Sequence, residues 1–321
     1  MNIVAGAKHG DLQPLYGLLM QTELPERIVT SLPGYRRMGP VRAGNEAYVQ
    51  LQNDNYGSVI LAVCQMFFDE RIENPASDEL FHQLEHLGHL AFKYHNQPDA
   101  GLWELRGSKR VHTFSSIMCW AGCDRLAKIA KKLNHLDREK FWADAAVEIK
   151  QFIMERAWDP EQNSLIAVCS GETKELDAAL LLVGELGFLA PDDPKFIGTV
   201  EVSVFVSSSC LNMSKRIGKI LKKGDFLYRY VEKDDFGLPE NAFTICTFWY
   251  VNALAYIGRK AEARELFEKL LSKRNHVGLF SEDLDVHTGE LWGNFPQTYS
   301  MVGLINSAIW LSKSWTDAGL C

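Results

Sequence analysis

The sequence predicts an all-α protein whose helices pair into hairpins that form a closed ring. Apolar residues recur at alternating spacings of three and four along most of the chain, which is typical of helices with one buried face. Runs with strand-like alternation are few. The helical patterns come in pairs at intervals of about 35 to 50 residues, with polar loops between them, and such repetition favours an array of helical hairpins.

The composition fits a globular chain. It has 321 residues, 46% of them hydrophobic, which allows a substantial buried core, and we expect a single domain over residues 1–321. A net charge of −7 disfavours a nucleic-acid surface. The first residues carry no signal peptide, and no apolar run reaches the roughly 18–20 residues that a membrane span needs. We therefore expect a cytoplasmic protein with no nucleic-acid or membrane partner, and its oligomeric state stays open.

The seven cysteines are interpreted as buried thiols. Their number is odd, and most of them lie within apolar helical runs, which favours reduced cysteines over a disulfide framework. Cys119 and Cys123 are one helical turn apart, but a metal site would need further ligands that the surrounding sequence does not supply. We expect neither a metal ion nor an organic cofactor.

The first part of the chain is predicted as a loop-rich arm over residues 1–43. Breakers such as Pro33-Gly34 and Gly39-Pro40 interrupt it, and little helical periodicity is present. Asn45 is a suitable N-cap for a helix that runs to about Phe68.

Four further helices follow in order. The first, over residues 80–94, has its apolar side chains on one face and is closed by Pro98. The next two extend over 113–133 and 138–158, each with a continuous apolar stripe. The fourth, over 176–186, is apolar almost all round and is therefore expected to be buried on most sides.

The last part of the chain contains one helix pair and a final helix. The pair covers about 242–257 and 260–273, separated by Gly258, and the final helix covers 298–313. Before them, residues 202–214 are Ser-rich and β-branched where a helical pattern would otherwise continue. We interpret this segment as an insertion from retained intronic sequence, and a transcript that joins Glu201 directly to the residues near Arg216 would support that origin.

Two polar loops carry carboxylates that could act together. Residues 101–107 and residues 279–285 each carry a glutamate, Glu104 in the first loop and Glu282 in the second, and Gly and aromatic residues lie in or beside both loops. Glycoside hydrolysis needs a proton donor for the leaving oxygen and a second carboxylate that activates water or attacks the sugar. Taken alone, however, a Glu beside a Trp is more often a surface loop residue.

Sequence blocks along nearly the whole chain resemble glycoside hydrolase family 15, in the order of that family. The blocks are Gly34-Tyr35-Arg36, Pro40-Val41-Arg42, Leu51-Gln52-x-Asp54, Gly101-Leu102-Trp103-Glu104, Cys119-Trp120-x-x-x-Asp124-Arg125, Leu176-Asp177-Ala178-Ala179, Tyr228-Arg229-Tyr230, Cys246-Thr247-Phe248-Trp249, Ser281-Glu282-x-x-Asp285 and Gly293-Asn294-Phe295-Pro296-Gln297. The family comprises glucoamylases, glucodextranases and bacterial-type trehalases.

The resemblance implies an (α/α)6 barrel that hydrolyses α-glucosidic bonds with inversion. By position, Glu104 is similar to the general acid of the family and Glu282 to its general base. The resemblance further implies that Trp103 and Arg106 shape the sugar pocket and that Glu240 and Trp292 contribute to substrate binding. The expected substrate is an α-glucoside, either an oligosaccharide or trehalose, and the sequence leaves this choice open. For Trp120 and Trp249 we favour core packing.

The chain also departs from the family pattern. Bacterial-type members are about twice as long and carry a β-sandwich and a Trp-x-Arg-Asp segment ahead of the part that this chain resembles, so we expect about nine of the twelve barrel helices here. This departure supports an alternative, a truncated and catalytically inactive carbohydrate-binding or regulatory relic. An epimerase-type helical barrel lacks support, because such sites rely on histidines. Here His112 and His287 are interpreted as core or solvated residues.

Overall fold

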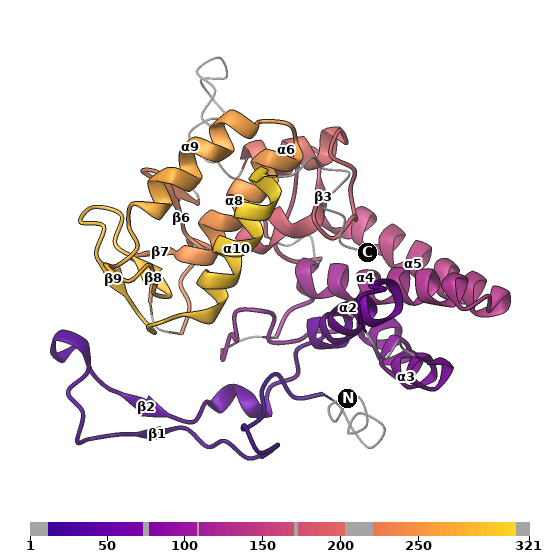
Figure 1. Cartoon of the computed structure of the whole chain (residues 1–321), viewed down its shortest axis with the longest axis horizontal. Coiled ribbons are helices and arrows are strands. Elements are labelled where there is room, and N and C mark those ends of the chain that lie inside the picture. The colour runs from indigo at the N-terminus through magenta and orange to yellow at the C-terminus, as the bar shows by residue number, and fades with distance from the viewer. Residues whose placement is uncertain are drawn as a thin grey trace. The chain divides into compact units, whose positions relative to one another are not determined.

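The computed structural model of the chain describes residues 12–72, 77–107, 109–169, 173–202, 221–235 and 237–312. Helices dominate these residues, and the strands are two-residue segments within the connections (Figure 1). The predicted all-α class is therefore confirmed. Two compact units make up the chain, Met1–Ile149 and Lys150–Cys321. Apart from Val202, the predicted insertion at 202–214 lies outside the described residues.

Helices of the first unit pack around a shared apolar core. They are α2 (Asp54–Phe68), α3 (Asp78–Tyr94) and α4 (Thr113–Lys132), followed by α5 (Leu136–Ala157), which continues into the second unit. The largest fully buried side chains of this core are Tyr56, Ile60, Phe81, Leu84, Leu87, Ile117 and Trp142. They recur at the spacings of three and four that place side chains on one helix face, so the helices at 80–94, 113–133 and 138–158 were predicted correctly.

The predicted helix over 45–68 is wrong in its first part. Asn45 does act as an N-cap, but of the short 3-10 helix η3 (Glu46–Val49), where its side chain accepts from the Ala47 N–H. The chain is then non-helical until α2. There the Asn53 backbone N–H donates to Asp99 Oδ2 at 2.8 Å, and the Asn53 side chain donates to the carbonyl oxygens of Tyr94, the last residue of α3, and of Gln97. These tertiary hydrogen bonds use the backbone and side-chain groups that a continuous helix would direct elsewhere.

A short antiparallel hairpin lies in the predicted arm. Strands β1 (Arg27–Ile28) and β2 (Arg42–Ala43) pair with Arg27 opposite Ala43, and the 3-10 helix η2 (Tyr35–Arg37) lies between them. Beyond the strands, the Val29 N–H donates to the Val41 carbonyl oxygen at 2.8 Å. Residues 27–29 of the arm are therefore hydrogen-bonded to residues 41–43, which lie on the other side of its turn.

The second unit is organised around one buried helix, α8 (Thr244–Tyr256). Its residues from Thr244 to Ala255 are all buried, and α9 (Lys260–Leu271), α10 (Thr298–Ser312) and the 3-10 helix η4 (Ala178–Val183) pack against it. The helices predicted at 242–257, 260–273 and 298–313 are confirmed. The core of this unit includes the fully buried side chains Phe188, Phe196, Phe248, Tyr250 and Phe280.

The region predicted as a helix over 176–186 is buried, as expected, but it forms η4 instead of an α-helix. Asp177 caps η4 through a bond from the Ala179 N–H at 2.7 Å, and the Ala178 N–H donates to the Arg229 carbonyl oxygen at 2.9 Å. The bond to Arg229 fixes the start of η4 to the connection between β6 and β7. Helix α6 (Pro194–Val202), which follows, was not predicted.

Three short strands support the second carboxylate loop. In this sheet β8 (Asp283–Leu284) lies between β7 (Ala242–Phe243) and β9 (Leu291–Trp292), and both pairings are antiparallel. Other two-stranded pairs are formed by β3 (Trp158–Asp159) with β4 (Ser164–Leu165) and by β5 (Lys222–Lys223) with β6 (Phe226–Leu227).

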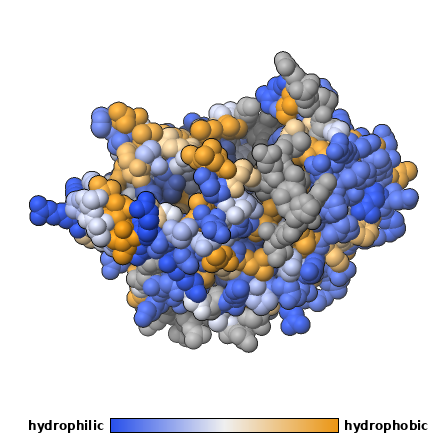
Figure 2. All heavy atoms as spheres, turned by 90° about the horizontal axis from the view of Figure 1, so that it is seen from below, coloured by the Kyte–Doolittle hydropathy of each residue, from blue (hydrophilic) through white to orange (hydrophobic). Residues whose placement is uncertain are grey.

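The cysteines within the described residues follow the prediction. All five, Cys64, Cys119, Cys123, Cys169 and Cys246, are buried, and burial raises the pKa of Cys123 to about 12. Cys210 and Cys321 lie outside the described residues. On the face shown in Figure 2, apolar side chains are scattered among hydrophilic ones. Within the described ranges, every helix is too short or too polar to cross a bilayer.

Candidate active site

A tight turn between α3 and α4 carries Glu104. The Glu104 N–H donates to the Gly101 carbonyl oxygen at 3.2 Å, and the Leu105 N–H donates to the Ala100 carbonyl oxygen at the same distance. Glu104 has a φ of 56°, in the left-handed region that residues other than glycine rarely adopt. Its side chain is exposed. The turn therefore presents a carboxylate to solvent from a constrained backbone.

Residues that precede α2 contact Glu104. Asn45 Nδ2 donates to Glu104 Oε2 at 3.3 Å. Gln50 Nε2 donates to the Glu104 carbonyl oxygen at 3.1 Å, and the Gln50 Oε1 accepts from Gln52 Nε2 at 3.2 Å. Both the carboxylate and the backbone of Glu104 thus have partners in the segment between the arm and α2.

A buried carboxyl group anchors the start of the same loop. Asp99 is fully buried, and its Oδ2 accepts from the Asn53 N–H and from Ser115 Oγ, both at 2.8 Å. Burial raises the pKa of Asp99 to about 6, against these hydrogen bonds and one from the Gly101 backbone. Burial, together with the nearby Asp99 carboxylate, raises the pKa of Asp54 at the start of α2 to about 7. Both carboxyl groups therefore hold protons more tightly than ordinary aspartic acids.

The neighbours of Glu104 that were predicted to shape the sugar pocket have different surroundings. Arg106 is exposed, and its Nη2 donates to Glu26 Oε2 at 2.8 Å, while Arg42 Nε lies 3.3 Å from Glu26 Oε1. The hydrogen bond from Arg106 is the main cause of a lowered pKa of Glu26. Arg106 therefore joins the loop to the β1–β2 hairpin. Trp103 is half-buried.

The two histidines near the carboxylate loops fit their predicted roles as core and solvated residues. His112 is buried at the start of α4, and burial lowers its pKa to about 4, with a smaller contribution from Arg110. His287 is exposed in the turn between β8 and β9.

In the second unit, Glu282 is held by Asn294. The backbone N–H of Asn294 donates to Glu282 Oε2 at 3.1 Å, and its Nδ2 donates to the same oxygen at 2.9 Å. Gly293, with a φ of 75°, lies directly beside the carboxylates, because an added Cβ would come within 3.0 Å of Glu282 Oε2 and 3.2 Å of Asp283 Oδ2. A side chain at position 293 would therefore displace these oxygens.

Asp283 occupies the centre of the three-stranded sheet. It lies opposite Phe243 on one side and Trp292 on the other, so these three side chains share one face of the sheet. Burial is the main cause that raises the pKa of Asp283 to about 7, with a further contribution from Glu282 and an opposing one from Arg229. Asp283 is therefore a second carboxyl group beside Glu282, in a less polar environment.

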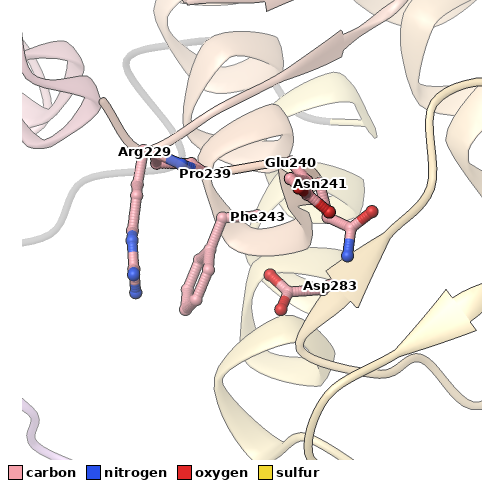
Figure 3. A pocket seen from close by; sticks show the side chains of 6 residues that line it. All are labelled: Arg229, Pro239, Glu240, Asn241, Phe243 and Asp283. Carbon is pink, nitrogen blue, oxygen red and sulfur yellow. The ribbon is translucent and has the colours of Figure 1, made fainter. Parts of the chain in front are cut away.

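A small pocket of about 90 Å³ opens on this sheet. Its lining residues are Arg229, Pro239, Glu240, Asn241, Phe243 and Asp283. Arg229 and Phe243 extend in the same direction, and the Asp283 carboxylate points toward them (Figure 3). The Arg229 guanidinium lies 5.5 Å from the centre of the Phe243 ring and donates to Asp234 at 2.9 Å. Charged, amide and aromatic groups thus line one cavity.

The structure places the predicted site residues in two groups. Trp103, Glu104 and Arg106 belong to the loop of the first unit. In the second unit Trp292 pairs with the residue after Glu282, and Glu240 lines the pocket. Among the described residues, no group of three or more His, Cys, Asp or Glu side chains is arranged to hold a metal ion.

Sequence reasoning missed Arg229 and Asp283. Arg229 stands in the block Tyr228-Arg229-Tyr230, and Asp283 directly follows Glu282, so both were visible in the sequence. The place of Asp283 in the pocket depends on the pairing of β7 with β8, in which Phe243 lies opposite Asp283, 40 positions away. Two-residue strands leave too little alternation in the sequence to predict such a pairing.

Comparison with known proteins identifies close sequence relatives. The family profile described as glycosyl hydrolases family 15 matches residues 10–309. A trehalase of Thermoplasma volcanium is 35% identical over 298 residues, which cover 92% of this chain and 45% of that protein. A trehalase of Mycolicibacterium smegmatis is 34% identical over 321 residues, covering 98% of this chain and 45% of that protein. The chain thus spans about half the length of the curated relatives it matches.

Solved structures share the fold at lower identity. A wild-type glycosidase superposes with a TM-score of 0.67 and 15% identity, covering 87% of this chain and 74% of that one. A bacterial glucoamylase complexed with acarbose gives a TM-score of 0.62 and 15% identity, covering 83% of this chain and 42% of that one. The glucoamylase of Saccharomycopsis fibuligera gives 0.60 and 13%, covering 81% and 70%. The predicted (α/α)6 barrel class is confirmed by this likeness.

Proposed function

Because the chain belongs to glycosyl hydrolase family 15, we propose that it hydrolyses α-glucosidic bonds with inversion at the anomeric carbon. Glu104 is the general acid, which gives its proton to the leaving oxygen, and Glu282 is the general base, which takes a proton from the attacking water. Inverting enzymes in general keep their two carboxyl groups about 6.5–9.5 Å apart, which leaves room for that water.

The observation that carries this proposal is the extent of the sequence match. The family profile covers residues 10–309 and so includes both carboxylate loops. The relatives at 32–35% identity are named trehalases. Trehalose is therefore the first substrate to test, ahead of maltose and isomaltose.

The surroundings of each carboxylate suit its proposed role. Glu104 is exposed on its turn, where a leaving oxygen can approach it. Glu282 accepts both Asn294 bonds on Oε2, which leaves Oε1 to accept a proton from water. A base that is fixed through one oxygen has a defined direction of attack.

The pocket residues provide the groups that a sugar ring needs. Carboxylates and amides accept and donate hydrogen bonds to hydroxyls, and an aromatic face packs against the apolar side of the ring. Arg229 and Glu240 supply charged partners, Asp283 supplies a carboxyl group, and Phe243 supplies the aromatic face. Asp234 orients Arg229 through the bond at 2.9 Å. We assign sugar binding to these side chains, with Trp103, Arg106 and Trp292 as further contacts.

The test is glucose release from trehalose, maltose and isomaltose, with the anomers followed by NMR. Inversion predicts one β-glucose and one α-glucose from each trehalose at early times, whereas retention would give α-glucose alone. We expect Glu104→Gln and Glu282→Gln each to lower turnover by about 10²-fold or more. Glu148→Gln, at an exposed position of α5, is the matched control and should retain full activity.

A second candidate is an inactive carbohydrate-binding relic of the family. A folded wild-type chain that binds α-glucosides but releases no glucose from them would support the relic and contradict the hydrolase. Turnover that disappears in Glu104→Gln would exclude the relic.

A further inference from the structure

The side chain of Asn45 is fixed in orientation by its own backbone surroundings. Its Oδ1 accepts from the Ala47 N–H at 3.0 Å, as the N-cap of η3, and its backbone N–H donates to the Leu24 carbonyl oxygen at 3.0 Å. An amide whose oxygen is used in this way must direct its nitrogen to the other side. That nitrogen, Nδ2, donates to Glu104 Oε2 at 3.3 Å.

Gln50 holds the backbone of the same residue. Its Nε2 donates to the Glu104 carbonyl oxygen at 3.1 Å and to the Leu105 carbonyl oxygen at 3.5 Å. Gln52 in turn donates to the Gln50 side-chain oxygen, which fixes the direction of the Gln50 amide. A left-handed backbone at a residue other than glycine persists only where its surroundings enforce it, and such residues cluster at functional sites.

From this geometry we propose that Asn45 and Gln50 are positioning residues for Glu104. Asn45 orients the carboxyl group through Oε2, and Gln50 holds the turn in its left-handed conformation. The inference rests on the proposed role of Glu104 as general acid. Among the described residues, Asn45 is the one side chain that donates a hydrogen bond to this carboxylate.

The arrangement determines where the acid proton is carried. Because Oε2 accepts from an N–H donor, the proton of the neutral acid resides on Oε1. During the reaction this proton passes from Oε1 to the glycosidic oxygen as the bond from that oxygen to the anomeric carbon breaks. The electron pair of the broken bond stays with the leaving oxygen, and the Glu104 carboxylate that forms is stabilised by the Asn45 donor.

The charged groups nearby are largely engaged with one another. Arg106 and Arg42 both pair with Glu26, at 2.8 and 3.3 Å. Glu46 follows Asn45 directly, in the first turn of η3. The Asn45 amide is therefore the direct contact through which this segment acts on the Glu104 carboxyl group.

Substitutions at position 45 can remove the hydrogen-bond donor to Glu104 while keeping the oxygen that caps η3. Asn45→Ser keeps an oxygen that can cap η3 but removes the amide donor, and Asn45→Asp keeps the cap and adds a negative charge. Gln50→Glu removes the donor to the Glu104 carbonyl at nearly the same size. Asn134→Asp, at an exposed position after α4, is the matched control.

Two measurements test the proposal. The first is the pH profile of kcat and KM on trehalose. The second is a ¹³C NMR titration of the Glu104 carboxyl carbon, whose signal is assigned by its absence in Glu104→Gln. We expect the titration midpoint and the basic limb of the profile to move upward by about half a unit in Asn45→Ser and by more in Asn45→Asp. In both variants kcat should fall about tenfold while KM changes less than kcat. Gln50→Glu should lower kcat, and Asn134→Asp should match wild type.

A titration midpoint in Asn45→Ser that equals that of wild type overturns the inference, even if Asn45→Asp shifts, because an added charge acts at a distance. An inactive but folded wild-type chain instead contradicts the proposed function. In that case the titration still decides whether Asn45 holds the carboxyl group.

Discussion

Glu282 and Asp283 are neighbours in the chain, yet their carboxyl groups have different surroundings. The Glu282 carboxylate receives two hydrogen bonds from Asn294, whereas Asp283 is enclosed in the pocket beside Phe243. Hydrogen bonds from N–H groups favour a charged carboxylate, and burial favours a neutral one. Adjacent residues therefore place their carboxyl groups in different environments, which suits different roles for the two groups.

Asp283→Asn is predicted to make stability less dependent on pH. The pKa of Asp283 is raised from 3.8 to about 7, so the folded chain binds this proton more tightly than the unfolded chain. The stability that this proton contributes is complete below pH 3.8 and is lost as the pH rises to about 7. Relative to wild type, the variant should therefore gain on the order of 4 kcal/mol of unfolding free energy between pH 4 and pH 8 in urea titrations.

Asp285→Asn provides a control in which the carboxyl group's contribution to stability changes with pH in the opposite direction. Backbone hydrogen bonds from Thr288 and His287 lower the pKa of Asp285, so the stability it contributes is present above its ordinary pKa and is lost in acid. This variant should therefore be destabilised at pH 8 and approach wild type at low pH. A pH dependence in Asp283→Asn as steep as that of wild type would contradict the assignment.

Asn294→Ala is predicted to weaken catalysis without unfolding the chain. It removes the Nδ2 donor to Glu282 Oε2 and keeps the backbone donor to the same oxygen. With one donor fewer, the ionised form of Glu282 is less stable, so the acidic limb of the kcat/KM profile on trehalose should move to higher pH. The expected loss in kcat is about tenfold. An unchanged acidic limb in an active, folded variant would argue against Glu282 as the base.

At the scale of elements, α2 and α4 cross in close contact. A Cβ added to Gly57 would lie 1.9 Å from the Met118 carbonyl oxygen, which is backbone of α4. Gly122 lies on the opposite helix at the same crossing, but its added Cβ would meet Ile60 Cδ1 at 3.1 Å and Gly57 Cα at 3.2 Å. The helices approach this closely only because both positions lack side chains.

Gly57→Ala is therefore predicted to lower the free energy of unfolding by about 3 kcal/mol, because the backbone of α4 must move. Gly122→Ala should change it by about 1 kcal/mol or less, since Ile60 can shift and alanine favours the helix. Urea titration of both variants measures the difference. Similar effects from the two substitutions would show that the crossing is less tight than described.

Helices with a regular apolar stripe were predictable from the sequence, and segments fixed by distant hydrogen bonds were not. Helix α3 buries Leu80, Leu84, Leu87 and Ala91, which lie on one helix face, so it could be predicted from the sequence pattern. By contrast, the break before α2 depends on the bond from Asn53 to Asp99, and the 3-10 geometry of η4 depends on Arg229. These hydrogen-bond partners are remote in the sequence, so a local sequence pattern does not predict them.

At the scale of the whole chain, the proposed catalytic carboxylates could be selected from the sequence because they stand in blocks that resemble the family. Glu104 and Glu282 lie on loops, as expected, and Glu240 lines the pocket. The contribution of Asp283 arises from pairing between β7, β8 and β9, and that of Asn45 from the way η3 is capped. These roles require the folded arrangement, which the spacing of residues in the sequence leaves undetermined.

The buried cysteines allow a test of the whole fold. In a Cys210→Ser, Cys321→Ser variant, the remaining five thiols all belong to buried positions. Burial raises the pKa of Cys119, Cys123 and Cys246, which further reduces their reactivity. We expect almost no reaction of the native variant with Ellman's reagent and reaction of all five thiols in guanidinium chloride. Rapid labelling of several thiols under native conditions would contradict this packing.

The left-handed backbone at Glu104 has a consequence for laboratory evolution. At such a position glycine is more favourable than glutamate by about 1 kcal/mol, because it has no Cβ to clash with the preceding turn. A library screened only for heat resistance or expression should therefore enrich Glu104→Gly. The selected clones would look improved while having lost the proposed acid, so any engineering of this chain has to screen for turnover at every round.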